Sequence, residues 1–163
     1  MKKLLLILLF TTIATAQEKI SLGVYQDAKL TFYRDNHGNE PFTADIVITA
    51  NLEGKQFKHY YFSLQPFYEY ADLHGGKLHR YGINTNWNLN QLIITNTTIT
   101  AGIGLGLIHR FSMGFPSYQA NLELKHKIAQ WLELAIRTEL VRRSELEDPQ
   151  FKPNLSYGII IEL

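Results

Sequence analysis

A strict alternation of apolar and polar residues constrains this chain more than any other feature of its sequence. The clearest case is the segment 98–107, in which one face carries Ile99, Ala101, Ile103, Leu105 and Leu107 and the other carries Thr98, Thr100, Gly102, Gly104 and Gly106. A period of two places alternate side chains on opposite faces of a β-strand, whereas a helix repeats near every third or fourth residue. Three glycines in ten residues also disfavour a helix. The segment is therefore predicted to be a strand.

The same alternation recurs along the whole chain. It covers eight segments in all: 20–32, 44–52, 60–70, 80–87, 98–107, 118–125, 132–143 and 155–163. The seventh is ambiguous, because residues 128–143 also fit a helical stripe that runs through Trp131, Ala135 and Leu140. We expect a strand there, since an eighth strand would complete the set formed by the other seven. The prediction is an all-β chain.

The connections between these segments are expected to alternate in length. Residues 53–55, 88–90 and 127–130 form short links, while 34–43, 72–79, 110–117 and 144–153 form longer ones that are rich in Pro, Gly, Asp and His. This pattern predicts an up-and-down antiparallel meander with long loops at one end and tight turns at the other.

The first 16 residues form a separate unit. Lys2 and Lys3 precede an apolar run, and Ala14-Thr15-Ala16 closes it with small residues, which is typical of a secretory signal peptide cleaved after Ala16. The apolar run is shorter than the roughly 20 residues of a membrane-spanning helix. We therefore expect a leader over 1–16 and one exported domain over 17–163.

Composition excludes several classes of function. Removing Lys2 and Lys3 leaves 14 basic and 15 acidic residues, a near balance that argues against a nucleic-acid partner. The chain has no cysteine, so disulfides, thiolate metal sites, cysteine nucleophiles and lipoprotein anchors are ruled out.

An eight-stranded antiparallel meander fits two architectures of opposite polarity, a soluble barrel with apolar residues inside and a transmembrane barrel with apolar residues outside. Glycines on the polar face favour the membrane version, because they suit a narrow interior better than a solvent-facing strand. Aromatic residues on the apolar face gather near strand ends, which predicts interfacial girdles. The girdle residues are Tyr60, Tyr68, Tyr70, Tyr81, Trp87 and Tyr118.

Charges of both signs lie on the polar face and are expected to pair inside the barrel lumen. This predicted lumenal charge network comprises Asp45, Glu69, Arg80, Glu123, Lys125, Arg137, Glu139 and Arg143. The alternative is the solvated outer face of a soluble barrel.

With its export signal, eight amphipathic segments and alternating loops, the chain resembles the small eight-stranded outer-membrane proteins of Gram-negative bacteria, the size class of OmpA and OmpX. The resemblance covers residues 17–163 and implies a cell outer-membrane location without implying an activity. Leu163 departs from the aromatic residue that usually ends such chains, and the Ala-Gln cleavage context and Tyr-rich strands look like examples from Bacteroidetes.

The sequence contains residue types for two kinds of chemical site, a metal site and a hydroxyl nucleophile with a histidine base. Four histidines are expected near one rim: His37, His74, His79 and His109. Contact with lipopolysaccharide headgroups explains them better than a metal site does. No histidine base is expected on the same face as the candidate nucleophiles Ser63, Ser112 and Ser156. We therefore expect no catalytic residue, metal or cofactor. The expected role is structural or surface-interacting. We expect a monomer that contacts outer-membrane lipid and lipopolysaccharide and that could contact an extracellular partner through its long loops. A lipid-modifying outer-membrane enzyme and a soluble periplasmic barrel that binds an apolar ligand are the alternatives.

Overall fold

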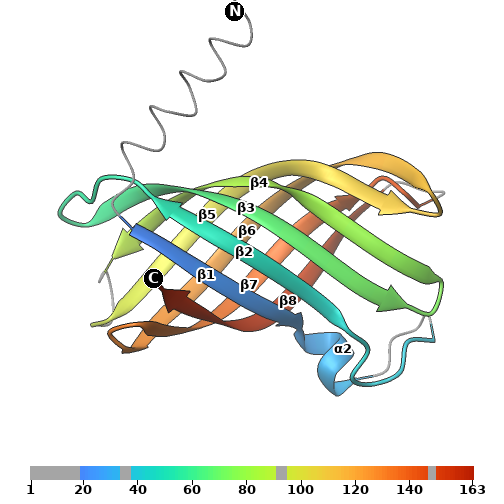
Figure 1. Cartoon of the computed structure of the whole chain (residues 1–163), viewed down its shortest axis with the longest axis horizontal. Helices are drawn as coiled ribbons and strands as arrows, with labels where there is room; N and C mark the ends of the chain where they lie inside the picture. The colour runs from blue at the N-terminus through green and yellow to red at the C-terminus, as the bar shows by residue number, and fades with distance from the viewer. Residues whose placement is uncertain (1–18, 34–37, 91–94, 147–149) are drawn as a thin grey trace, which may run out of the picture.

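The computed structural model describes residues 19–33, 38–90, 95–146 and 150–163. These residues form one closed antiparallel barrel of eight strands in the order β1-β2-β3-β4-β5-β6-β7-β8, which confirms the predicted all-β up-and-down fold (Figure 1). The strands are β1 (Lys19–Asp27), β2 (Asp45–Glu53), β3 (Tyr60–Leu73), β4 (Gly76–Asn90), β5 (Thr97–Arg110), β6 (Met113–Ala129), β7 (Leu132–Arg143) and β8 (Gln150–Glu162). The expected leader over 1–16 lies outside the described residues.

The first and last strands close the barrel. Leu22 of β1 is paired with Ile161 of β8 and, on its other side, with Ala50 of β2. A closed sheet has no unpaired edge, so every strand finds both of its neighbours within one chain.

The ambiguous seventh segment is a strand. β7 pairs with β6 through Arg137 opposite Glu123, and with β8 through Ile136 opposite Tyr157. Two partners already placed on either side outweigh the helical propensity of its Leu, Glu, Ala and Arg residues, because tertiary context overrides weak local preference.

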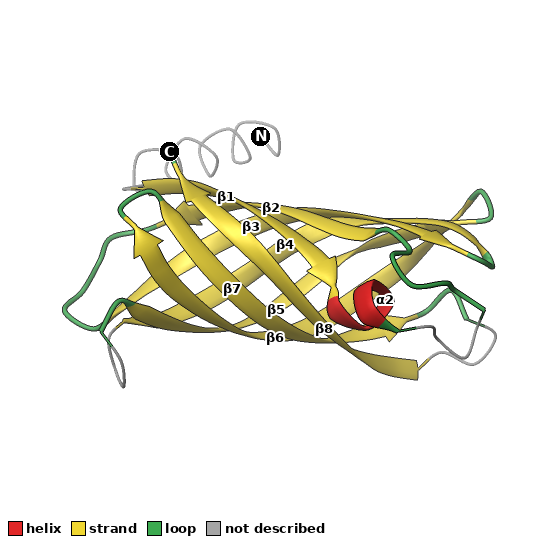
Figure 2. Cartoon of the chain, turned by 90° about the horizontal axis from the view of Figure 1, so that it is seen from below, coloured by secondary structure: helices red, strands yellow, loops and turns green. Residues whose placement is uncertain are grey.

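The first predicted segment is wrong beyond Asp27. The strand stops there, and a short helix, α2 (Ala28–Phe32), follows it at the end of the barrel opposite the described chain termini (Figure 2). The Asp27 carboxylate accepts a hydrogen bond from the Leu30 amide at 2.6 Å, which caps the helix, and Leu30 turns into the barrel mouth, where it is 6% exposed. The apolar residues Ala28, Leu30 and Phe32 alternate with polar ones as in a strand, but they belong to this helix.

The expected alternation of long and short connections is also wrong. β3 and β4 are joined by only residues 74–75, and β5 and β6 by 111–112, where long loops were expected. Conversely, links 54–59 and 91–96 are longer than predicted, while 130–131 is short as expected. The paired strands continue through most of the residues that were expected to form loops. For example, Asp72 pairs with Lys77, and Arg110 pairs with Met113.

The polar face of the sheet points inward and the apolar face outward. Asn84, Asn88 and Thr100 are fully buried, whereas Ile103 and Leu105 are 72% and 62% exposed. The core of this barrel is thus largely a polar lumen.

Candidate functional site

The centre of the lumen is filled by two arginines and three glutamates. Arg80 on β4 donates to Glu69 at 2.5 Å, to Glu139 at 3.0 Å and to Gln119. Arg137 on β7 reaches the other oxygen of Glu139 at 3.4 Å. Glu139 therefore bridges the two guanidinium groups, so the five charges form one connected cluster.

The second arginine has further partners. One Arg137 nitrogen donates to Gln65 at 2.8 Å and to Glu123 at 3.2 Å. Tyr25 donates its hydroxyl to Glu123 at 2.5 Å, and the Arg137 guanidinium carbon lies 4.3 Å from the centre of the Tyr25 ring. A buried charge is tolerated only when it is paired and hydrogen-bonded, and these contacts meet that condition.

Amides and hydroxyls fill the space around the charges. Gln65 donates to Asn51, Asn51 to Ser21, and Asn84 to Gln65, at 2.6, 3.1 and 3.0 Å. Nearer the described chain termini, Asn88 contacts Ser63, Thr100 and Lys125. The middle of the barrel is therefore bridged across its width by side chains.

The predicted charge network is thus brought together only in part. Glu69, Arg80, Glu123, Arg137 and Glu139 form the central cluster. Lys125 lies nearer the described chain termini, where it donates to Asn88 at 3.1 Å and lies 5.9 Å from the Tyr61 ring centre. Asp45 is buried without an ion pair to a described residue, and Arg143 pairs with Glu145 in the link after β7.

The lumen also holds apolar residues that the sequence pattern did not predict to face inward. Tyr25, Val47, Phe67, Ala135 and Ile160 form a buried cluster inside the barrel. Polarity alone does not mark the inner face, because these apolar side chains also point inward. Their positions in the two-residue repeat could have identified them, since each of the five lies an even number of residues from a polar inward-facing residue on its own strand.

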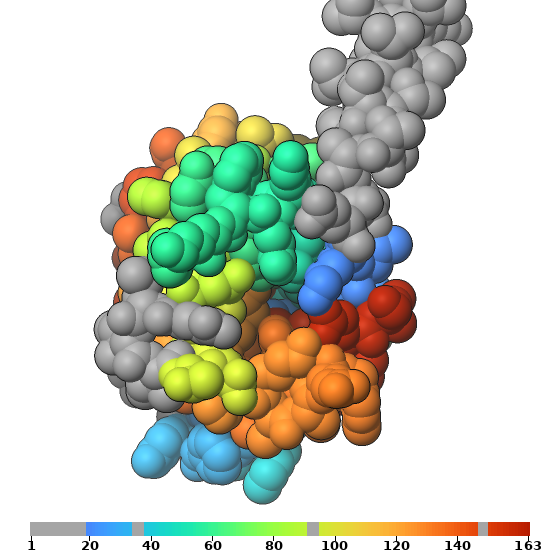
Figure 3. Space-filling view, turned by 90° about the vertical axis from the view of Figure 1, so that its left-hand side faces the viewer, coloured from blue at the N-terminus to red at the C-terminus, as the bar shows by residue number. Residues whose placement is uncertain are grey.

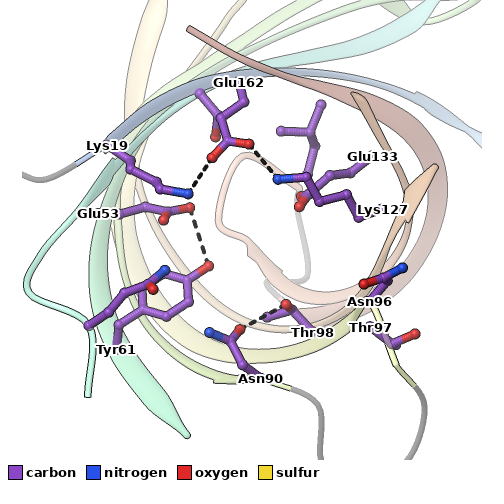
Figure 4. Close-up of a pocket in the computed structure, with 13 residues that line it drawn as sticks. Lys19, Glu53, Tyr61, Asn90, Asn96, Thr97, Thr98, Lys127, Glu133 and Glu162 are labelled. Atoms are coloured by element: carbon purple, nitrogen blue, oxygen red, sulfur yellow. Dashed lines mark hydrogen bonds and ion pairs between the residues drawn. The ribbon is translucent and has the colours of Figure 1, made fainter. Parts of the chain in front are cut away.

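Each end of the lumen opens into a cavity. The terminal-end cavity has a volume of about 160 Å³ and lies beside Lys19 and Glu162, at the end shown in Figure 3, where β1 and β8 lie side by side. Glu162 accepts from Lys19 and Lys127 at 2.6 Å each, and Tyr61 donates to Glu53 at 3.2 Å (Figure 4).

The other cavity, which we call the α2-end cavity, has a volume of about 440 Å³ and lies above the central cluster. Its lining combines apolar residues such as Leu30, Leu73 and Leu78 with charged ones such as Asp45 and Arg110. It is the larger of the two cavities, and its polar groups are less completely paired.

The predicted girdle residues lie on the outward face. Tyr68 is paired with Tyr81 across β3 and β4, while Tyr118 on β6 lies opposite Leu105. At the other end, Tyr60 stacks on Phe57 with ring centres 4.9 Å apart, and Trp87 is paired with Phe62. Tyr70 is half-buried beside His79.

The histidines singled out in the sequence do not form a metal-ligand set within the described part of the chain, and His37 lies outside it. His79 and His109 are paired on neighbouring strands, but His79 is hydrogen-bonded to the Tyr68 hydroxyl at 2.7 Å and His109 stacks on Tyr81 at 5.8 Å.

The candidate nucleophiles have other partners. Ser63 accepts from Asn88 at 2.9 Å, and Ser156 donates to the Arg137 carbonyl at 3.5 Å. Across the residues that the structure describes, no helix is long and apolar enough to cross a membrane.

These features define a small, closed, polar-lumen β-barrel. Comparison of the chain with protein-family models and with curated proteins finds no match to either.

Proposed function

We propose that the chain is a monomeric outer-membrane β-barrel of a Gram-negative bacterium, of the Bacteroidetes type, with a structural or surface-interacting role and no catalytic activity. The observation that carries this proposal is the outward apolar belt. Its members come from every strand and include Leu22, Ile48, Phe62, Ile83, Ile103, Leu105, Leu122, Ile136 and Ile159, each more than 36% exposed. A water-soluble monomer rarely exposes so large a continuous apolar surface, whereas lipid chains would cover it.

The aromatic residues support a bilayer of normal thickness. Tyr60 and Tyr70 mark the two girdles on β3 and enclose 11 residues of that strand, counting both ends. A tilted strand crosses the hydrocarbon region in about 9–11 residues. Amphipathic rings favour the headgroup level at both interfaces, so the spacing matches the expected belts.

The interior supports a filled barrel. Among the described residues, the Arg80 and Arg137 cluster occupies the centre of the barrel, where a pore would need an open channel and a soluble lipid-binding barrel would need a central apolar cavity. The hydrogen-bond partners of Ser63 and Ser156 are likewise not those of an acyl-transfer site. A structural or surface-interacting role fits this arrangement better than transport or lipid hydrolysis.

The ends of the barrel suggest its orientation. With the described termini on the periplasmic side, α2 and the hairpin tips at 74–75 and 111–112 would face outward, and Lys77, His79 and His109 near those tips would meet lipopolysaccharide headgroups. An extracellular partner would contact the same end.

The test is to express the full chain in a Gram-negative host, separate the two membranes by density, and compare migration with and without boiling in detergent. We expect a species in the outer-membrane fraction that shifts on boiling. Recovery as a detergent-free soluble protein without a shift would overturn the location and favour a soluble barrel. Hydrolysis of lipid A or phospholipid by the purified protein would overturn the non-catalytic role.

A further inference from the structure

The α2-end cavity has the size and mixed lining of a small-molecule site. Its volume of about 440 Å³ lies within the range of about 300–1,000 Å³ that is usual for ligand pockets. Leu73 and Leu78, from β3 and β4, form part of an apolar wall, and Leu30 of α2 and Val141 of β7 add to it. Such a wall would accommodate an apolar body.

A carboxyl group with an unpaired oxygen lies in the same cavity. Asp45 at the start of β2 is only 9% exposed, yet its Oδ1 atom makes no hydrogen bond. The nearby side chain of Gln26 is already occupied, because its oxygen accepts from the Asp45 backbone amide at 3.4 Å and its nitrogen donates to the Thr43 carbonyl at 3.0 Å. The buried Oδ1 of Asn154, which also lines the cavity, is likewise unpaired. Two buried acceptors therefore lack a donor.

Groups of the opposite kind line the same space. The Nε–H of Arg110 is buried without an acceptor, and no described acidic residue forms an ion pair with Arg110 or Lys152. Of the other lining cations, Arg80 binds Glu69 and Glu139, Arg143 binds Glu145, and Lys29 is exposed. The lining thus offers an unpaired carboxyl oxygen, together with cations that form no ion pair with a described residue, around an apolar wall.

We propose that the α2-end cavity binds a small zwitterion with an apolar body, namely an apolar amino acid or short peptide with free termini. Its ammonium group would donate to Asp45 and Asn154, its carboxylate would accept from Arg110 and Lys152, and its side chains would contact Leu30, Leu73 and Leu78. Burial of unpaired polar groups is costly, so a ligand that supplies the missing partners gains affinity and specificity from them. The site requires the closed barrel and is independent of whether a membrane surrounds it.

The experiment measures binding of the dipeptide Leu-Leu to the full-length barrel in detergent micelles by titration calorimetry. The same titration is repeated with the N-acetylated and the C-amidated dipeptide. We expect Leu-Leu to bind and each capped form to bind about tenfold more weakly, because each cap removes one charge-assisted hydrogen-bonding group. Equal binding of all three peptides, or no binding of Leu-Leu at millimolar concentration, would overturn the proposal.

Two variants assign the ends of the ligand. Asp45→Asn should abolish the preference for a free amino terminus and keep the preference for a free carboxylate, and Arg110→Gln should do the reverse. Glu53→Gln at the opposite mouth and Arg142→Gln on the outward face serve as matched controls that should leave binding unchanged. An Asp45→Asn variant that folds, as judged by its migration shift on boiling, and still discriminates against the acetylated peptide would contradict the assignment. The capped peptides test the wild-type protein, so the proposal stays falsifiable if a variant fails to fold.

Discussion

At the scale of single residues, glycine makes room for the aromatic rings and amides inside the lumen. Gly82 and Gly106 lie opposite each other on β4 and β5. A Cβ atom at Gly82 would lie 2.7 Å from the Gly106 Cα and 2.9 Å from the Phe67 ring, and would also collide with the Leu105 carbonyl oxygen. Two of these three neighbours are backbone atoms, which cannot move aside without disturbing the strand pairing.

Gly82→Val should therefore destabilise the barrel. The expected loss is about 1–3 kcal/mol in the free energy of unfolding, the usual cost of overpacking, measured by urea titration of the refolded protein. Ala101→Val is the matched control, because Ala101 is exposed on the outward face of β5 and a larger side chain has room there. Equal stability of Gly82→Val and wild type would contradict the inward placement of this glycine.

Arg137 provides the second residue-scale prediction. Arg137→Met should leave Glu123 and Glu139 with one fewer positive partner in a buried site, and loss of one member of a buried ion pair typically costs about 3–5 kcal/mol. By contrast, Lys19→Met breaks a half-exposed pair with Glu162 and should cost at most about 1 kcal/mol. Urea unfolding of both variants checks the difference, and similar losses would contradict a structural role for the central cluster.

At the scale of elements, the sequence predicted the strands well and their ends poorly. The two faces of segment 98–107 follow directly from period two, because every inward-facing residue of that segment is a threonine or a glycine and every outward-facing one is apolar. The hairpin at 74–75 could not be recognised, since Asp72, His74 and Gly75 are typical loop residues although β3 and β4 extend to that turn. Strand length there is set by pairing across the sheet.

The candidate site was predictable only in part for a related reason. Alternation identified Glu69, Arg80 and Glu139 as inward-facing, but their contacts depend on the stagger between strands, which brings Arg80 of β4 to Glu139 of β7. The α2-end cavity depends on α2, and alternation in 28–32 resembled a strand. Only the Asp27 cap, a side-chain to backbone hydrogen bond, distinguishes the two.

The prediction for a single element concerns the Asp27 cap of α2. Asp27→Ala removes the acceptor of the Leu30 amide, which should destabilise α2 by about 1 kcal/mol while leaving the barrel closed. Hydrogen exchange should accelerate at residues 30–33 and remain unchanged in β4 and β5. Lys29→Ala is the control, since the side chain of Lys29 is exposed. Unchanged exchange at Leu30 in the Asp27 variant would contradict the capping role.

At the scale of the whole molecule, pairing of β1 with β8 closes the wall of the barrel, and side chains fill the middle of its lumen. The cluster of Arg80, Arg137 and Glu139 separates the two end cavities. The wild-type protein in a planar lipid bilayer should therefore show no steady ion conductance under an applied voltage. A stable open channel of constant conductance would contradict a lumen filled across its width.

The central claim is that the outward apolar face contacts lipid, and the effect of Leu105→Arg on stability in a bilayer tests it most directly. Leu105 lies between the Tyr81 and Trp87 levels of the neighbouring strand, where a charge facing hydrocarbon costs about 2–4 kcal/mol. We predict a loss of that size in the free energy of unfolding, measured by urea titration in phosphatidylcholine vesicles, and a loss below about 1 kcal/mol for Gln130→Arg in the exposed turn between β6 and β7. Equal stability of Leu105→Arg and wild type would show that this face meets water, which would contradict the account.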